Sequence, residues 1–320
     1  MQNQLLWGRR LLTYPARHLR RRKMLNEHQS PTAILHFVGG IGDQLLLTCV
    51  ARQLRQNGEK QIWIASQHPD LFKGNRDVDL VISKDDLDWM LKNSAARLIS
   101  PNYAPHLAEE RRDIPPSKHI LALMCEQAKL KGLIQLRPYL FLDDEEKTTG
   151  RYSDRQIAIQ SSGRSAKHHM RTKEWYPERF QEVVNQLKSR FDFVQIGNEN
   201  DPPLKGALDL RGKSNIRQTA AILAASKLFV GLVGFPMHLA RAVDCPAVCV
   251  YGGRELPSQT GYICNVNLVG ETSCSPCWRW DDCPGNHVCM DQIKSSAVVS
   301  AIETQMQKPG DELPVETHVL

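Results

Sequence analysis

The sequence lacks any run of about 20 apolar residues, the length that a helix needs to cross a bilayer. A signal peptide with a small-residue cleavage site is also missing. We therefore expect a protein that stays in the cytoplasm. Its 320 residues, of which 41% are hydrophobic and 24% are charged, suit a soluble globular chain long enough for two domains with separate cores.

Most of the chain also lacks a basic stripe, because much of its positive charge lies at the start. An arm, residues 1–24, carries seven basic residues that dominate the net charge of +6: Arg9, Arg10, Arg17, Arg20, Arg21, Arg22 and Lys23. Leucine, tryptophan and tyrosine interleave with them, which is typical of a helix lying on an anionic membrane surface. A solvated basic tail is the alternative. Nucleic acid is not expected as a partner, since no motif for it follows.

Internal repeats are absent, but apolar runs and glycine turns alternate in two similar blocks. In residues 25–150 we predict strands at 33–38, 61–65, 80–83 and 97–100, and helices at 44–55 and 119–131. In residues 151–308 we predict strands at 156–160, 193–196, 228–231 and 247–251, and helices at 177–189, 216–226 and 296–307. This order predicts an α/β fold of two Rossmann-like doubly wound domains facing a cleft. A linker at 138–151 joins them, and the tail, residues 309–320, is predicted to be loosely ordered.

Two short motifs argue against particular ligands. The Gly40-x-Gly42 turn lacks the third glycine and the later acidic residue of a dinucleotide site, so an NAD site is not expected. Asp86-Leu87-Asp88 formally matches an Asp-x-Asp signature for a divalent ion. Its charged, helix-like surroundings instead predict a solvated surface.

The stretch from Gly231 to Gly253 predicts a binding site for an anion. It orders a strand, a glycine turn at Gly234, a helix started by Pro236, and a second strand. The free N–H groups at the start of such a helix carry the positive end of its dipole. We therefore expect a phosphate or another anion to bind there.

Cysteine is unevenly distributed. Five of the nine cysteines, Cys49, Cys125, Cys245, Cys249 and Cys264, lie in apolar contexts and are predicted to belong to the core. The others, Cys274, Cys277, Cys283 and Cys289, lie within 16 residues of one another in a Cys-rich loop, 274–289. Four thiolates can close a structural zinc or iron site, whereas free thiols or disulfides are the alternatives.

The loops resemble those of glycosyltransferase family 9, the heptosyltransferases of lipopolysaccharide synthesis. Met237-His238-Leu239-Ala240 matches the end of the family's Asp-Thr-Gly-x-Met-His-Leu-Ala segment, and the run from Lys173 to Phe180 matches Lys-x-Trp-x-x-Glu-Arg-Phe. The resemblance, over about Ala33 to Ile293, implies the GT-B architecture and no catalytic metal. It implies transfer of a sugar, with inversion, from a nucleotide-diphosphate donor such as ADP-heptose to a hydroxyl of a glycan or glycolipid acceptor, such as lipopolysaccharide core. Work of this kind suits the cytoplasmic face of the inner membrane.

The same resemblance assigns roles to residues of both predicted domains. Gly40-Ile41-Gly42-Asp43 is similar to the family's Ser-x-Gly-Asp loop, whose aspartate is the proposed general base; a helix-capping role for Asp43 is the alternative. Lys173 is implied to neutralise the leaving diphosphate, unless it is a surface lysine beside Trp175. Further residues are candidates for binding the donor (Glu199, with Asp201 in reserve, Gly234, Pro236, Met237 and His238) or for an acceptor-side loop (Gly40, Gly42, Arg164 and Lys167).

One departure from the family pattern bears on function. Leu232 and Val233 replace the Asp and Thr that contact the donor in heptosyltransferases. A different donor sugar, a catalytically inactive nucleotide-binding member and a metal-clustered assembly protein therefore remain alternatives to the heptosyltransferase prediction.

Overall fold

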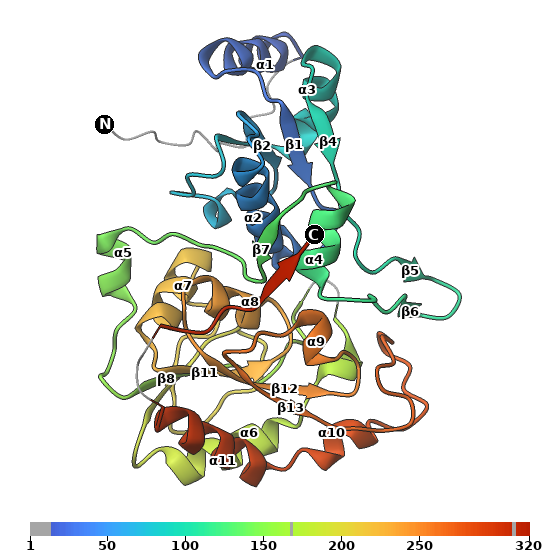
Figure 1. Cartoon of the computed structure of the whole chain (residues 1–320). Coiled ribbons are helices and arrows are strands. Elements are labelled where there is room, and N and C mark those ends of the chain that lie inside the picture. Colours follow the sequence, from blue (N-terminus) through green and yellow to red (C-terminus); the bar gives the residue numbers. More distant parts are fainter. Residues whose placement is uncertain (1–13, 167–168, 309–311) are drawn as a thin grey trace.

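The computed structural model describes residues 14–166, 169–308 and 312–320, and it contains two parallel sheets, one in each half of the chain (Figure 1). The first sheet has the order β3-β2-β1-β4, with β1 at Ala33–His36, β2 at Ile62–Ala65, β3 at Leu80–Ile82 and β4 at Arg97–Ile99. The second has the order β10-β9-β8-β11-β12-β13, with β8 at Gln156–Ile159, β9 at Asp192–Gln195, β10 at Leu208–Asp209, β11 at Leu228–Leu232, β12 at Ala247–Gly252 and β13 at Val266–Val269. The predicted α/β class is confirmed.

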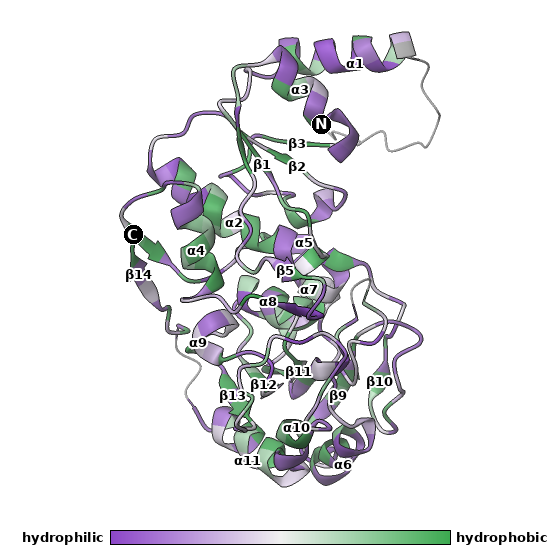
Figure 2. Cartoon of the chain, turned by 90° about the vertical axis from the view of Figure 1, so that its right-hand side faces the viewer, coloured by the Kyte–Doolittle hydropathy of each residue, from purple (hydrophilic) through white to green (hydrophobic). Residues whose placement is uncertain are grey.

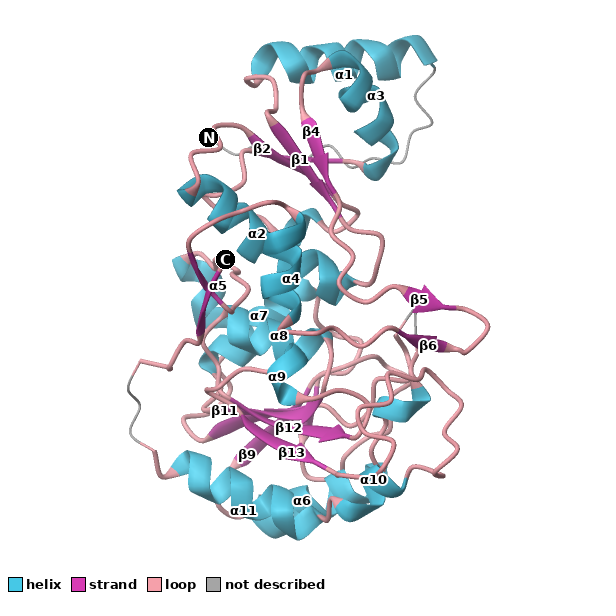
Figure 3. Ribbon diagram, turned by 45° about the vertical axis from the view of Figure 1, so that its right-hand side comes forward, coloured by secondary structure: helices cyan, strands magenta, loops and turns pink. Residues whose placement is uncertain are grey.

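Helices cover the sheets and fill the space between them. They are α1 (Tyr14–Glu27), α2 (Ile41–Gln56), α3 (Leu87–Asn93), α4 (Ile120–Gln127), α5 (Asp144–Thr149), α6 (Pro177–Leu187), α7 (Ile216–Ala225), α8 (Phe235–Ala242), α9 (Pro257–Thr260), α10 (Val288–Gln292) and α11 (Ser295–Met306). Short 3₁₀ turns are η1 (Pro69–Leu71), η2 (Lys84–Asp86) and η3 (Arg171–Lys173). Figure 3 shows α6, α10 and α11 below the second sheet, whereas α7, α8 and α9 lie on its other face, toward α2 and α4. A hairpin of β5 (His106–Leu107) and β6 (Arg112–Asp113) projects beside the second half.

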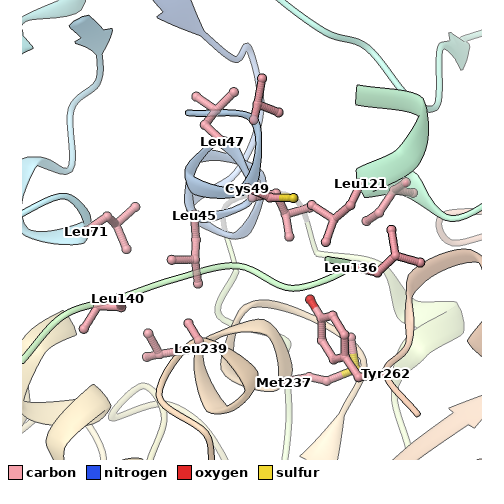
Figure 4. Packing of buried hydrophobic residues seen from close by; sticks show 14 of the residues in the cluster. Leu45, Leu47, Cys49, Leu71, Leu121, Leu136, Leu140, Met237, Leu239 and Tyr262 are labelled. Carbon is pink, nitrogen blue, oxygen red and sulfur yellow. The ribbon is translucent and has the colours of Figure 1, made fainter. Parts of the chain in front are cut away.

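One large apolar cluster spans both halves, and two smaller clusters each lie within one half. Figure 4 shows Leu45 and Leu121 of the first half facing Met237, Leu239 and Tyr262 of the second, and all five are buried in a single cluster. Helix α2 packs directly on α8 through this cluster. Burial of apolar surface contributes about 25 cal/mol per Å², so the cluster fixes the two halves relative to each other rather than leaving them loosely tethered.

The chain end does not behave as predicted. The tail was expected to be loosely ordered, but β14 (Thr317–Val319) pairs antiparallel with β7 (Leu133–Gln135) of the first half. The prediction is wrong there because a three-residue strand gains its hydrogen bonds from a segment far away in sequence. The predicted linker also contains α5, which packs on α7.

Helix α1 is held on the first half by ion pairs to a buried carboxylate. Arg21 pairs with Asp86 at 2.7 Å and Arg20 pairs with the same carboxyl group, which is 2% exposed. The Arg21 guanidinium also lies 5.9 Å from the centre of the Trp89 ring. The prediction that Asp86 belongs to a solvated surface is therefore wrong, because the two arginines compensate the charge that burial would otherwise penalise.

The arm is only partly described. Its residues 1–13, including Arg9 and Arg10, lie outside the described residues, whereas Figure 2 shows that most residues of α1 are hydrophilic. Within the described part of the chain, the model has no helix with both the length and the apolar character that a bilayer crossing requires.

Candidate active site

A cleft of about 1400 Å³ opens between the two halves, at the carboxyl ends of the strands. It is lined by the loops that follow β1, β8, β9, β11 and β12, together with residues 100–106. Among the predicted site residues, it brings together Gly40, Gly42, Asp43, Lys173, Gly234, Pro236 and His238. The volume exceeds the 300–1,000 Å³ typical of small-molecule sites, so a nucleotide-sugar and part of an acceptor can fit together.

Asp43 lies in the first turn of α2 and is held from both sides. The backbone N–H of Gly40 donates to its Oδ2 at 2.7 Å, and the hydroxyl of Tyr103 donates to its Oδ1. Burial raises the pKa of Asp43, although both hydrogen bonds and the charge of Lys173 act against the rise. A carboxylate has about four acceptor positions, so the capping contact leaves room for a substrate hydroxyl. Capping and base roles are therefore compatible at this residue.

The loop that carries Asp43 lies against the start of α8. A side chain at Gly42 would come within 3.5 Å of the Phe235 backbone. The helix begins at Phe235, and Gly234 before it has φ of 157°, a conformation that favours glycine. Pro236 occupies a position in the first turn where its missing N–H costs nothing. The free N–H groups of this turn therefore face the same cleft as Asp43.

Lys173 is half-buried at the cleft wall, in an ion pair that the sequence did not reveal. Its Nζ pairs with Glu255, and Arg254 pairs with the same carboxylate at 2.5 Å. Burial acts to raise the pKa of Glu255, but the charges of Lys173 and Arg254 outweigh it and bring the pKa down to about 2. Burial also lowers the pKa of Lys173, against the attraction of Glu255. The predicted alternative, a free surface lysine, does not describe this half-buried, ion-paired group.

Glu255 and Arg254 were missed because they form no recognised motif. One signal was available: Gly253-Arg254-Glu255 directly follows a buried apolar strand, β12. Polar residues at the carboxyl end of a parallel strand are where α/β sheets place their ligand contacts. Arg254 also pairs with Asp113 at 2.7 Å, across 141 residues of sequence.

Some predicted donor residues lie elsewhere. Glu199 is exposed and does not line the cleft. Asp201, by contrast, is 3% exposed and lines the cleft. Its carboxylate accepts hydrogen bonds from the Asn198 N–H at 2.8 Å and from the Ser165 hydroxyl at 3.0 Å. Met237 is fully buried, and its Sδ lies 3.4 Å from the Tyr251 hydroxyl of β12, so it cannot contact a ligand. The structure thus favours Asp201 over Glu199 as a candidate for donor binding, and it excludes Met237 from that role.

The acceptor-side loop is only partly described. Arg164 is exposed and lies outside the cleft lining, and Lys167 and His168 lie outside the described residues. The start of this loop is held by Glu174, which accepts hydrogen bonds from the Ser162 hydroxyl and the Gly163 N–H, each at 2.8 Å.

His238, predicted to bind the donor, has contacts in both the core and the cleft. Its Nδ1 lies 2.6 Å from the Tyr262 hydroxyl in the core, and the residue also lines the cleft. Burial lowers its pKa to about 3, so the ring is neutral at physiological pH. It can offer a hydrogen bond to a ligand but no positive charge.

Leu232 and Val233 form an apolar wall beside the α8 turn. They are 3% and 5% exposed, and both line the cleft. The donor contacts that Asp and Thr make in the family therefore have no polar counterpart at these two positions.

The Cys-rich loop does not form a metal site as it stands. Cys274 is exposed, while Cys277, Cys283 and Cys289 are half-buried free thiols. Over the described ranges, which include all four, no three His, Cys, Asp or Glu side chains are grouped so that they could hold a metal. A structural zinc or iron ion therefore stays a prediction. The five other cysteines are buried, as predicted.

Comparisons with known proteins agree with this geometry. The family model for glycosyltransferase family 9 (heptosyltransferase) matches residues 134–284. The structure is similar to the ADP-heptose lipopolysaccharide heptosyltransferase II of E. coli, with a TM-score of 0.63 and 16% identity over 86% of this chain and 98% of that one. A search of curated sequences gave no significant match.

Two further solved structures share the fold. TibC, an iron-containing dodecameric glycosyltransferase of enterotoxigenic E. coli, aligns with a TM-score of 0.66 and 16% identity, over 87% of this chain and 79% of that one. A family 9 glycosyl transferase of Veillonella parvula aligns with a TM-score of 0.61 and 16% identity, over 87% and 98%. The family match over residues 134–284 and the shared fold of two doubly wound domains facing a common cleft support a glycosyltransferase of the GT-B type that is similar to family 9.

Proposed function

We propose that the protein transfers heptose, or a related sugar, from a nucleotide-diphosphate donor to a hydroxyl of a cell-surface glycan such as lipopolysaccharide core, with inversion. The observation that carries this proposal is that one cleft holds a carboxylate of raised pKa, Asp43, together with the ion-paired Lys173 and the first turn of α8. A TibC structure is described as a complex with ADP-D-β-D-heptose, which supports the choice of donor.

In the proposed reaction Asp43 takes the proton of the acceptor hydroxyl while that oxygen attacks the anomeric carbon. The new bond joins the acceptor oxygen to this carbon, and the bond from the carbon to the diphosphate oxygen breaks on the opposite face. Inversion follows from this single displacement. A positioned base of raised pKa supports such a step, because proton acceptance strengthens as the pKa rises toward the working pH, and general bases contribute about 10²–10⁴-fold.

The leaving diphosphate is proposed to bind Lys173 and the first turn of α8. The α8 N–H groups supply fixed partial positive charge, which stabilises developing negative charge without reorganisation. Glu255 keeps Lys173 in place until the donor arrives, and the donor phosphates then share the lysine with it. Asp201 is the proposed partner of the nucleotide or sugar on the second half.

The donor assignment is tested with purified protein and a panel of ADP-, UDP- and GDP-sugars. Each donor is added in turn, and both the melting temperature and the release of nucleoside diphosphate are followed, because a ligand of the folded state raises the melting temperature. We expect ADP-heptose to give the largest shift and the fastest release. A selective response to another sugar nucleotide would replace the donor, since Leu232 and Val233 have removed two polar contacts.

We also propose that α1 brings the enzyme to the anionic cytoplasmic face of the inner membrane, where a glycolipid acceptor resides. Arg17, Arg22 and Lys23 on α1 are exposed, and Leu19 beside them is 68% exposed. Each basic residue near an anionic surface contributes about 1 kcal/mol of attraction. Arg20 and Arg21 are not counted among these residues, because they bind Asp86.

The membrane proposal is tested by sedimentation with vesicles. The wild type is expected to bind phosphatidylcholine vesicles containing phosphatidylglycerol more than pure phosphatidylcholine vesicles. The R17E/R22E variant should lose most of this difference, while R151E/K205E, with the same change in charge on exposed residues of the second half, should keep it. Equal binding of all three proteins would refute a role for α1.

A further inference from the structure

The β5–β6 hairpin of the first half and the Cys-rich loop of the second are joined backbone to backbone. Asp113 N–H donates to the Trp278 carbonyl at 2.9 Å, and Trp280 N–H donates to the Arg111 carbonyl at 3.1 Å. Arg112 and Arg279 form an antiparallel bridge between these bonds. Two segments more than 150 residues apart therefore meet at one edge of the cleft.

Aromatic rings from both segments lie on this edge. The His106 and Trp280 rings are 4.6 Å apart between centroids, at 45°, and both residues line the cleft with Trp278. We call His106 and Trp280 the aromatic platform. Figure 3 shows the hairpin beside the loops at the carboxyl ends of the second sheet.

A buried carboxylate fixes the platform. Asp113 Oδ1 accepts from Trp280 Nε1 at 2.9 Å and lies 3.0 Å from His106 Nδ1, and its Oδ2 accepts from Arg254 at 2.7 Å. Asp113 and Arg254 are 6% and 1% exposed, so this base is shielded from water. Charge-assisted hydrogen bonds among buried groups hold both rings in one orientation, as preorganised binding sites require.

We propose that the aromatic platform is a subsite for a sugar ring of the acceptor glycan, a proposal that rests on the function proposed above. A pyranose presents an apolar C–H face, which packs on an aromatic ring, and a rim of hydroxyls, which hydrogen-bond to polar groups nearby. The platform offers the rings, and the His106 imidazole, whose side chain is 41% exposed, offers a polar edge.

The position of the platform selects the acceptor rather than the donor. Tyr103, which holds Asp43, is followed three residues later by His106, and both line the cleft. Three residues span at most about 11 Å of backbone, so the chain that carries His106 begins close to the tyrosine that holds the proposed base. The first turn of α8, where the diphosphate is proposed to bind, lies against Gly42 of the loop that carries Asp43.

The test compares W280L, W280F and H106A with the wild type. The probes are the donor found in the sugar-nucleotide panel and lipid-free lipopolysaccharide core oligosaccharide as acceptor. W280L and H106A should raise the KM for the oligosaccharide between about threefold and tenfold, while W280F should stay within about twofold of the wild type. W89L is the matched control, because Trp89 is half-buried on α3 outside the cleft.

Hydrolysis of the donor without acceptor separates this proposal from the proposed function. The platform variants should hydrolyse the donor at the wild-type rate, because they leave the donor site intact. An unchanged oligosaccharide KM, or a rise in the donor KM instead, would overturn the subsite alone. A wild type that neither hydrolyses nor transfers any sugar would overturn the function and the subsite together. If W280L unfolds, H106A decides the matter, since its side chain is largely outside the core.

Discussion

Replacing Glu255 by glutamine tests the buried charge network at the cleft wall. Glu255 is 2% exposed and accepts from both Lys173 and Arg254. Glutamine preserves the shape but removes the negative charge, so it leaves two cations beside each other in a buried site. Removing one partner of a buried ion pair is far more destabilising than losing an exposed pair.

The magnitude follows from the pKa of Glu255, which lies at about 2 in the folded protein against an ordinary value of 4.5. That difference corresponds to about 3 kcal/mol of stabilisation by the charged form. Because the folded pKa is lowered, this stabilisation is fully present above about pH 4.5 and is lost as the pH falls through about 2. E255Q should therefore cost about 3 kcal/mol at pH 7, and less as the solution is acidified.

The assay is urea unfolding of both proteins at pH 7, 5.5 and 4. The difference in unfolding free energy should be constant between pH 7 and 5.5 and begin to shrink at pH 4. D282N is the control, because Asp282 forms an exposed pair with Arg279 and should contribute under about 1 kcal/mol. A cost of E255Q below about 1 kcal/mol at pH 7, or one that grows on acidification, would refute the reasoning.

Three further predictions concern the junction of the halves and the Cys-rich loop. Arg217 of α7 donates to the Phe141 carbonyl at 2.6 Å and pairs with Glu146. R217M should therefore lower the free energy of urea unfolding by about 3–5 kcal/mol, and a decrease under about 1 kcal/mol would contradict the importance of this pair. A methyl group at Gly150 would overlap the backbone of Ala221, so G150A should lower the free energy of unfolding by about 1–3 kcal/mol. G285A is the control, because its methyl group would meet only the Val288 side chain, at 3.6 Å, and the unfolding free energy should not fall. If the four loop thiols bind metal, plasma emission analysis of protein purified without chelator should find about one zinc or iron ion per chain. Replacing all four cysteines by serine should abolish this metal content. A wild-type protein without bound metal would refute the metal prediction.

The order of elements could be read from the sequence where local signals are strong. The β1–turn–α2 unit with Asp43 and the strand–Gly234–α8 unit both have apolar strands, a glycine turn and a helix start within 25 residues of chain. Each pattern depends only on residues that are close in sequence, so it can be recognised without knowing the long-range contacts of the fold.

The missing features are contacts between distant segments. The Arg254–Asp113 pair joins residues 141 positions apart, and Asp86 is buried only because Arg20 and Arg21 of α1 reach it. Glu199 was preferred over Asp201 because both follow the same strand, and only the turn geometry decides which carboxylate is turned inward. A single sequence contains no pattern for such choices.

The most direct test of the account is the transfer rate of D43N. The variant keeps the size of Asp43 and an oxygen that can accept from Gly40 N–H, but it cannot take a proton. With the donor and acceptor of the wild-type reaction, we predict a fall in kcat of at least about 100-fold, with an unchanged donor KM and melting temperature. A D43N enzyme that retains transfer within about threefold of the wild type would contradict the assignment of Asp43 as the base.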